Sequence, residues 1–167
     1  VANLPGVAQF SPVSHVEPSR TDPGTAWVAL DRHMFDDPAP YVFKTADFGK
    51  TWTRLSTGLP PQGFVWVLRQ DPKNPRLLWA GTELGLYASH DEGRSWRRSH
   101  LKNFPTVAVH DILVHPREND LILGTHGRAI WVFDDATPLQ QFDPGTPLQA
   151  QLFDVRPALR FPVRFTR

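Results

Sequence analysis

The apolar positions of this chain form short runs, and each run ends at a cluster of Gly, Pro, Asp or Asn. In the middle of the sequence these runs cover residues 65–70, 77–81, 85–89 and 96–99. Short apolar runs between turn residues predict β-strands, and no segment shows the 3.6-residue period of an amphipathic helix. We therefore expect four antiparallel strands in this unit and no helix between Val65 and Phe133.

The pattern of strands and turns is repeated along the chain. Residues 79–91 align with residues 122–134 without a gap, which predicts further strands at 107–114, 121–124 and 129–133. An acidic or histidine residue precedes proline at a corresponding place in each of three units, at Pro18, Pro72 and Pro116. The first spacing is longer because the first unit contains an insertion. A repeat of about 40–45 residues is typical of β-propeller blades.

The most specific repeat is the motif Ser/Thr-x-Asp-x-Gly-x-Ser/Thr-Trp, whose two aspartates lie 44 residues apart. Its residues are Thr45, Asp47, Gly49, Thr51 and Trp52, and then Ser89, Asp91, Gly93, Ser95 and Trp96; the third unit retains Asp134 but lacks the Gly and Trp. An Asp that starts a tight turn accepts hydrogen bonds from backbone N–H groups, and Gly permits positive φ. The Trp ring can be buried between sheets. We therefore assign these residues a structural role rather than a catalytic one.

This motif resembles the Asp-box of BNR-repeat β-propellers, which include sialidases, xyloglucan-cleaving glycosidases, the photosystem II assembly propeller and sortilin-type receptors. Segments 17–33, 40–52, 71–72 and 125–135 are most similar to large bacterial proteins described as sortilin-like or glycosyl-hydrolase-like BNR repeat proteins. The resemblance extends over about residues 7–160. It implies an all-β fold but says little about activity, because one fold hosts many functions.

We predict three four-stranded antiparallel blades within residues 1–142, at about 7–59, 60–101 and 102–142, and an exit strand or linker at 143–167. Three blades do not close a ring, since propellers have about 4–8 blades, and the resemblance implies a parent of about seven. We therefore expect a part of a larger propeller. Its predicted partners are the remaining blades or other protein chains, in a homo- or hetero-oligomer.

Composition narrows the classes of function. The 167 residues are 40% hydrophobic, which is enough for a core of ordinary size. The formal net charge of +1 gives no reason to expect a nucleic-acid partner, and no apolar run is long enough to predict membrane insertion. The absence of cysteine excludes disulfides and a Cys-based zinc site. No cofactor is predicted. The resemblance implies an exported, periplasmic or extracellular bacterial parent.

Charged residues and histidines from all three units are expected on one face. In a propeller the loops between strands two and three, and the loops between blades, lie opposite the Asp turns. We predict that this loop face forms a pocket or docking surface for a protein or a glycan; the alternative is that its charges only brace neighbouring loops. The candidate residues are Asp31, Arg32, His33, Asp37, Glu83, His110, Asp111, His126 and Arg128.

Two other classes of site are alternatives to a binding or scaffold module. A glycoside hydrolase needs two carboxylates about 5–10 Å apart, one with a raised pKa. The acids available on the loop face are Asp31, Asp36, Asp37, Glu83 and Asp111, and none lies in a recognisable catalytic signature. A sialidase is disfavoured because Tyr41 and Tyr87, the only tyrosines, are in strands that lead to the Asp turns. A metal site from His33, His110 and His126 is not predicted, because no HxH or HExxH spacing is present.

Overall fold

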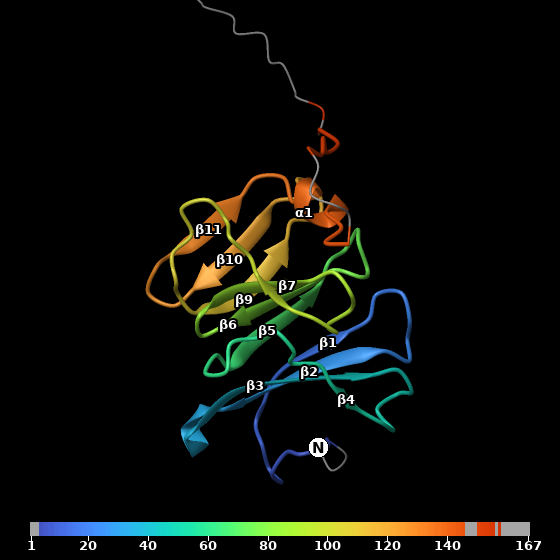
Figure 1. Ribbon diagram of the computed structural model, residues 1–167, viewed down its shortest axis with the longest axis vertical. Coiled ribbons are helices and arrows are strands. Elements are labelled where there is room, and N and C mark those ends of the chain that lie inside the picture. The colour runs from blue at the N-terminus through green and yellow to red at the C-terminus, as the bar shows by residue number, and fades with distance from the viewer. Residues whose placement is uncertain (1–3, 146–149, 156, 158–167) are drawn as a thin grey trace, which may run out of the picture.

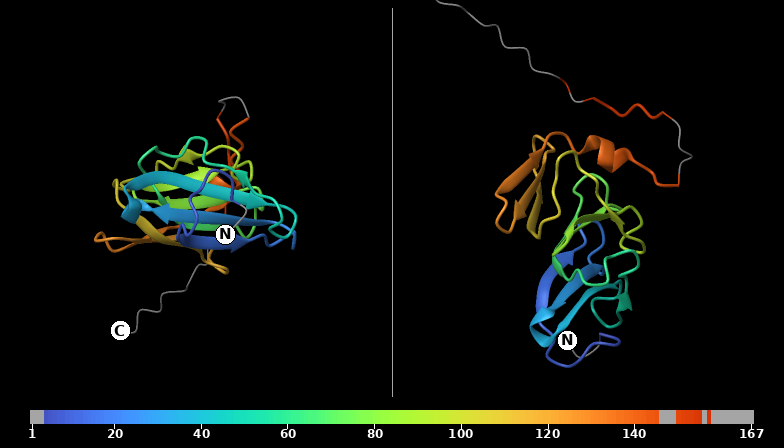
Figure 2. Two further views of the ribbon diagram at one scale, coloured as in Figure 1. Left: turned by 90° about the horizontal axis from the view of Figure 1, so that it is seen from below. Right: turned by 60° about the vertical axis from the view of Figure 1, so that its left-hand side comes forward.

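Three antiparallel β-sheets follow one another along the chain and along the long axis of the molecule (Figures 1 and 2). This computed structural model describes residues 4–145, 150–155 and 157. The first sheet contains β1 (Val13–Pro18), β2 (Ala26–Arg32), β3 (Asp37–Thr45) and β4 (Thr53–Arg54). The second contains β5 (Val65–Gln70), β6 (Leu78–Thr82), β7 (Gly85–Ser89) and β8 (Arg97–Arg98). The third contains β9 (Val109–Val114), β10 (Leu121–Thr125) and β11 (Ile130–Phe133).

Two short helical elements complete the fold of the described residues. The 3-10 turn η1 (His33–Phe35) connects β2 to β3, and the helix α1 (Thr137–Gln141) follows β11. Within each sheet the strands pair in chain order, and the first strands, β1, β5 and β9, lie side by side (Figure 1). Sheets stacked in this way, each with its first strand on the inside, are blades of a β-propeller.

The core of the molecule lies between successive sheets. Trp27, Leu68 and Trp96 are buried between the first and second sheets. Trp79 and Ile112 are buried between the second and third. Each sheet therefore depends on its neighbour to cover an apolar face, and each such aliphatic or aromatic side chain contributes about 1.5–3 kcal/mol by its burial.

The two Asp turns have the same geometry. Asp47 accepts hydrogen bonds from the Thr51 backbone N–H (2.9 Å) and the Thr51 hydroxyl (2.6 Å), and Asp91 accepts the same pair from Ser95 (2.8 and 2.6 Å). Gly49 and Gly93 have φ of 81° and 93°, where a side chain would be strained. The bonds from Thr51 lower the pKa of Asp47 to about 2. Burial opposes ionisation of Asp91, but the bonds from Ser95 outweigh it and lower its pKa too.

The tryptophans that end the two motifs have different surroundings. Trp96 lies between sheets, where its indole N–H donates to the Leu55 carbonyl (2.8 Å) and its backbone N–H donates to Thr57 (2.9 Å). Gly58 lies so close that a Cβ there would be 2.2 Å from the Trp96 carbonyl oxygen. Trp52 instead bonds within its own hairpin, to the Gly49 carbonyl (3.1 Å). The second Asp turn therefore connects two blades.

Among the described residues the third sheet has three strands, where we predicted four. Asp134 is exposed at the end of β11, and Asp135 accepts a hydrogen bond from the Thr137 N–H at the start of α1 (3.1 Å). The physical reason is that this unit lacks the Gly and Trp of the motif, and that Pro138 stands in the first turn of α1, where proline favours a helix start.

The helix α1 is fixed to the second sheet. The Gln140 amide donates to the Asp71 carboxylate (3.0 Å) and to Asn119 (2.9 Å), while Asn74 donates to the Gln140 carbonyl (2.7 Å). No strand occurs in the described part of the predicted exit segment, residues 143–145, 150–155 and 157. The rest of that segment lies outside the described residues, and the predicted blade boundaries stay predictions.

We predict that Asp91→Ala lowers the free energy of unfolding by about 1–3 kcal/mol, because it leaves the Ser95 N–H and both turn hydroxyls without their acceptor. Urea unfolding at pH 7 measures the change.

Asp134→Ala is the matched control, since Asp134 holds the corresponding repeat position but is exposed; its effect should be within about 0.5 kcal/mol. Because the folded pKa of Asp91 is depressed, its contribution is present above its ordinary pKa of 3.8 and is lost as pH falls through the folded pKa. Equal losses from the two variants would contradict the role of the turn.

Candidate functional site

Five rings from all three sheets form a continuous row on the loop face. His33 stacks on Phe64 with ring centroids 4.6 Å apart, and Phe64 meets Trp66 edge to face at 5.0 Å. Trp66 lies 4.2 Å from His110, and His110 lies 5.0 Å from His126. We call these five residues the aromatic ladder. It crosses from η1 through β5 and β9 to the turn after β10 and is the largest grouping of candidate residues in the described structure.

Irregular strand pairing positions the central rungs. The pairing of β5 with β6 shifts between Val65 and Val67, so that Trp66 is the extra residue of a β-bulge. The pairing of β9 with β10 shifts in the same way around His110, 44 residues further along the chain. A bulge re-aims the side chain of the extra residue. The innermost strands of the second and third blades thus place Trp66 and His110 together.

Two carboxylates accompany the ladder. The Glu83 carboxylate accepts a hydrogen bond from the Trp66 indole N–H (3.0 Å). Asp31 lies 2.6 Å from Nδ1 of His33 and also accepts the His33 backbone N–H (3.0 Å). Both acids therefore orient rings of the ladder.

Protonation is disfavoured at one rung of the ladder, His110. Burial and the neighbouring His126 lower the pKa of His110, and Glu83 only partly offsets them. The lowered pKa favours the neutral form of His110 at neutral pH, so this rung of the ladder is an uncharged ring.

Arg69 ties the innermost strands of the three blades together beside the ladder. Its Nε–H donates to the Ile112 carbonyl (2.9 Å), and its other nitrogens bond Glu17 (3.1 Å) and Asp111 (3.2 Å). Burial raises the pKa of Glu17, but hydrogen bonds from His15 and Gln70 together with the charge of Arg69 outweigh it, and the pKa is lowered. Asp111 therefore serves this contact between blades and not the ladder.

The other candidate residues lie apart from the ladder. Arg32 and Asp37 pair with each other at 2.8 Å beside η1, and the Tyr41 hydroxyl also donates to Asp37 (2.8 Å). The hydrogen bond from Arg32 is the main cause of the lowered pKa of Asp37. Arg128 is exposed, and its carbonyl accepts the Trp131 indole N–H (2.9 Å).

Two rungs of the ladder, Phe64 and Trp66, were missed by the sequence analysis. The sequence did contain an indication of Trp66, because Trp66 and His110 are separated by the 44-residue spacing of the repeat. In an alternating strand, however, an aromatic residue is usually interpreted as a core residue.

Among the described residues no group of three or more His, Asp or Glu is placed to hold a metal ion, and no helix is long and apolar enough to cross a membrane.

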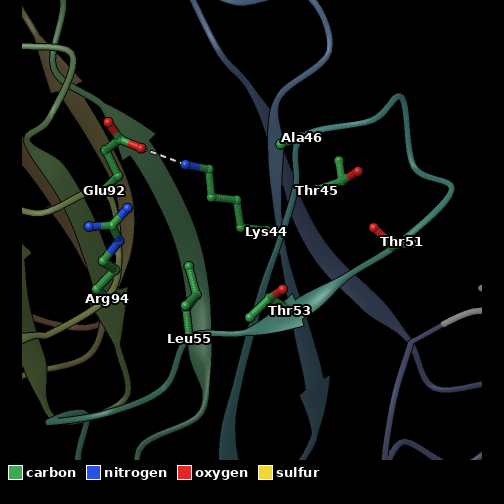
Figure 3. Close-up of a pocket in the computed structure, with 8 residues that line it drawn as sticks. All are labelled: Lys44, Thr45, Ala46, Thr51, Thr53, Leu55, Glu92 and Arg94. Atoms are coloured by element: carbon green, nitrogen blue, oxygen red, sulfur yellow. Dashed lines mark hydrogen bonds and ion pairs between the residues drawn. The ribbon is translucent and has the colours of Figure 1, made fainter.

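A groove of about 260 Å³ lies between the first and second sheets, at the Asp turns (Figure 3). Lys44 reaches across it to Glu92, with 2.5 Å between Nζ and Oε2. The hydroxyls of Thr45 and Thr51 serve the first Asp turn. The Lys44–Glu92 pair therefore joins the two blades across the groove, while the two hydroxyls are engaged within the first blade.

Comparison with known proteins identifies the fold. Similar solved structures include the GH74 xyloglucanase from Xanthomonas campestris (TM-score 0.59, 17% identity, 74% of this chain and 22% of that chain) and the GH74 enzyme from Niastella koreensis (TM-score 0.58, 17% identity, 74% and 21%). YCF48 from Cyanidioschyzon merolae is also similar (TM-score 0.56, 18% identity, 77% and 38%), and a further similar structure is YCF48 bound to D1 peptide.

At these identities the likeness shows the fold alone. The chain folds as blades of a β-propeller and spans between about one fifth and two fifths of the length of these structures. No protein-family model matches the sequence, and no curated protein matches it.

We predict that Arg69→Gln lowers the free energy of unfolding by about 2–3 kcal/mol, because Glu17 stays buried without its cation and three strands lose a shared donor. Chemical denaturation measures the change.

The control is Arg94→Gln, since Arg94 is exposed on the second Asp turn and should change stability by no more than about 0.5 kcal/mol. A loss in Arg69→Gln as small as that of the control would show that the three strands do not depend on Arg69.

Proposed function

We propose that this chain is a binding and scaffold module whose loop face takes a protein or glycan partner on the aromatic ladder. The observation that carries the proposal is the continuity of five rings across three blades. Aromatic rings supply large, rigid contact area at low cost in conformational entropy. The resemblance of the Asp turns to Asp-boxes supports a parent protein of the BNR, sortilin-like type that is exported by a bacterium.

Exposed apolar side chains extend the ladder at one end. Met34 and Phe35 in η1 are 81% and 57% exposed, directly after His33. Met and aromatic residues are enriched at the centres of protein interfaces. These two side chains therefore favour a protein partner over a purely polar ligand at this end of the face.

A second contact is proposed with a further blade. The outer face of the third sheet exposes Leu113, Ile130 and Val132, at 49%, 71% and 54%. In the first sheet the corresponding apolar face is covered, because Leu4 and Val7 pack on Val28 and its neighbours. The greater length of the similar structures supports an additional blade as the cover for the third sheet.

A glycoside hydrolase segment is the second candidate, favoured by the fold shared with GH74 enzymes. The surroundings of the acids on the loop face do not favour hydrolysis. Asp31 pairs with His33, and Asp37 pairs with Arg32 and has a lowered pKa, the opposite of a general acid. Glu83 and Asp111 are bonded to Trp66 and Arg69. Hydrolysis therefore has less support than binding.

We predict that Trp66→Ala weakens ligand binding at the loop face by tenfold or more, since it removes the central ring of the ladder. Soluble xyloglucan and other polysaccharides, in affinity electrophoresis, test the glycan class; a displayed peptide library tests the protein class.

Phe48→Ala is the matched control, because Phe48 is an aromatic residue, 76% exposed, in the first Asp turn. Binding that both variants weaken equally, or neither, would contradict the proposal. Release of reducing ends from xyloglucan that Glu83→Gln abolishes would establish the hydrolase instead.

We predict that the purified chain self-associates, because an uncovered apolar sheet face favours contact with another molecule. Sedimentation velocity should show concentration-dependent oligomers that Val132→Glu dissociates, while Val155→Glu, at an exposed position away from the sheets, leaves them unchanged. A monomer at all concentrations would count against the proposed blade contact.

A further inference from the structure

A separate pocket of about 280 Å³ lies between β7, β8 and α1, on the outer side of the second blade. The segment at residues 99–101 and the end of α1 complete its walls. None of its residues belongs to the aromatic ladder. Its lining residues are Ala88, His90, Arg97, Arg98, Ser99, His100, Leu101, Leu139 and Phe142.

One side of this pocket is apolar. Leu101 and Leu139 pack against the core between the second and third sheets, and Ala88 belongs to that core. Phe142 is 40% exposed and meets the His90 ring edge to face at 5.5 Å. His90 is fixed in turn, because its Nε2 lies 3.1 Å from the Leu139 carbonyl oxygen and donates to it. The apolar wall is therefore held in place without a ligand.

The polar lining of the pocket is basic. Four of the residues that line it are Arg or His, and none of its lining residues in the described part of the chain is a carboxylate. Arg98 donates to the Thr106 hydroxyl (2.6 Å). Arg97 is exposed and pairs with Ala88 across β7 and β8, which puts both side chains on the same side of the sheet. Within the described residues the Arg97 side chain has no ion pair and no hydrogen bond.

We propose that this pocket binds a small amphipathic carboxylate. The Arg97 guanidinium binds the carboxylate through two parallel hydrogen bonds, the geometry that arginine provides for this group. The apolar body of the ligand packs on Leu101, Leu139 and Phe142. A pocket with an apolar wall and a few convergent polar groups is the usual form of a small-molecule site. In the groove of Figure 3, by contrast, the Lys44 ammonium is already paired with the Glu92 carboxylate.

The test titrates the full chain with four probes and measures affinity by calorimetry. Hexanoate carries both features of the ligand, 1-hexanol lacks the charge, hexylamine reverses it, and acetate lacks the apolar body. Hexanoate should bind at least tenfold more tightly than each of the other three. Hexanol binding as tightly as hexanoate, or no detectable hexanoate binding at millimolar concentration, would overturn the proposal.

Substitutions in the chain test whether hexanoate binds in this pocket. Arg97→Gln should weaken hexanoate binding at least tenfold and leave the affinity for hexanol unchanged, while Phe142→Ala should weaken both. Arg76→Gln is the matched control, because Arg76 is exposed outside the pocket. Hexanoate binding that survives Arg97→Gln would refute the assignment.

A peptide with a free C-terminal phenylalanine, compared with its amide, distinguishes the two sources of a carboxylate. If the free-acid peptide binds more tightly than hexanoate, the site is one for chain ends and the proposal of a small free acid is wrong. Trp66→Ala should leave hexanoate binding unchanged, so this test and the test of the loop face fail independently.

Discussion

The structure depends on one constraint: each sheet has an apolar face that only the next sheet can cover. Trp27, Trp79 and Trp96 fill the spaces between sheets. Directional contacts then determine how the sheets are aligned. At the inner edge Arg69 bonds the first strands of all three blades, and near the rim the second Asp turn brings Trp96 to the backbone of the preceding blade.

The candidate site is a consequence of that alignment. The β-bulges turn Trp66 and His110 out of the regular alternation, and stacking of β5 beside β9 brings their rings to 4.2 Å. The flanking rungs come from loops, which a propeller gathers on the face opposite the Asp turns. The ladder exists only where the three blades are packed together, because its rings come from all three of them.

The 44-residue repeat was sufficient to predict sheets of short antiparallel strands, since turn chemistry and apolar runs are local properties. The fourth strand predicted for the third sheet is not found among the described residues, because Asp134 alone, without Gly and Trp, does not form the turn and Pro138 starts a helix. The order of strands and loops in a propeller was sufficient to predict that His33, His110 and His126 lie on one face. Trp66 was missed because a bulge arises from the hydrogen-bond register between strands, which apolar alternation does not reveal.

The most direct test of this account is an NMR measurement of nuclear Overhauser effects from the Trp66 indole ring in the full chain. If the innermost strands are held side by side as described, the ring should show contacts to both Phe64 and His110, with the indole N–H protected by Glu83. A Trp66 ring with contacts only inside its own sheet, and with a freely exchanging N–H, would contradict the account.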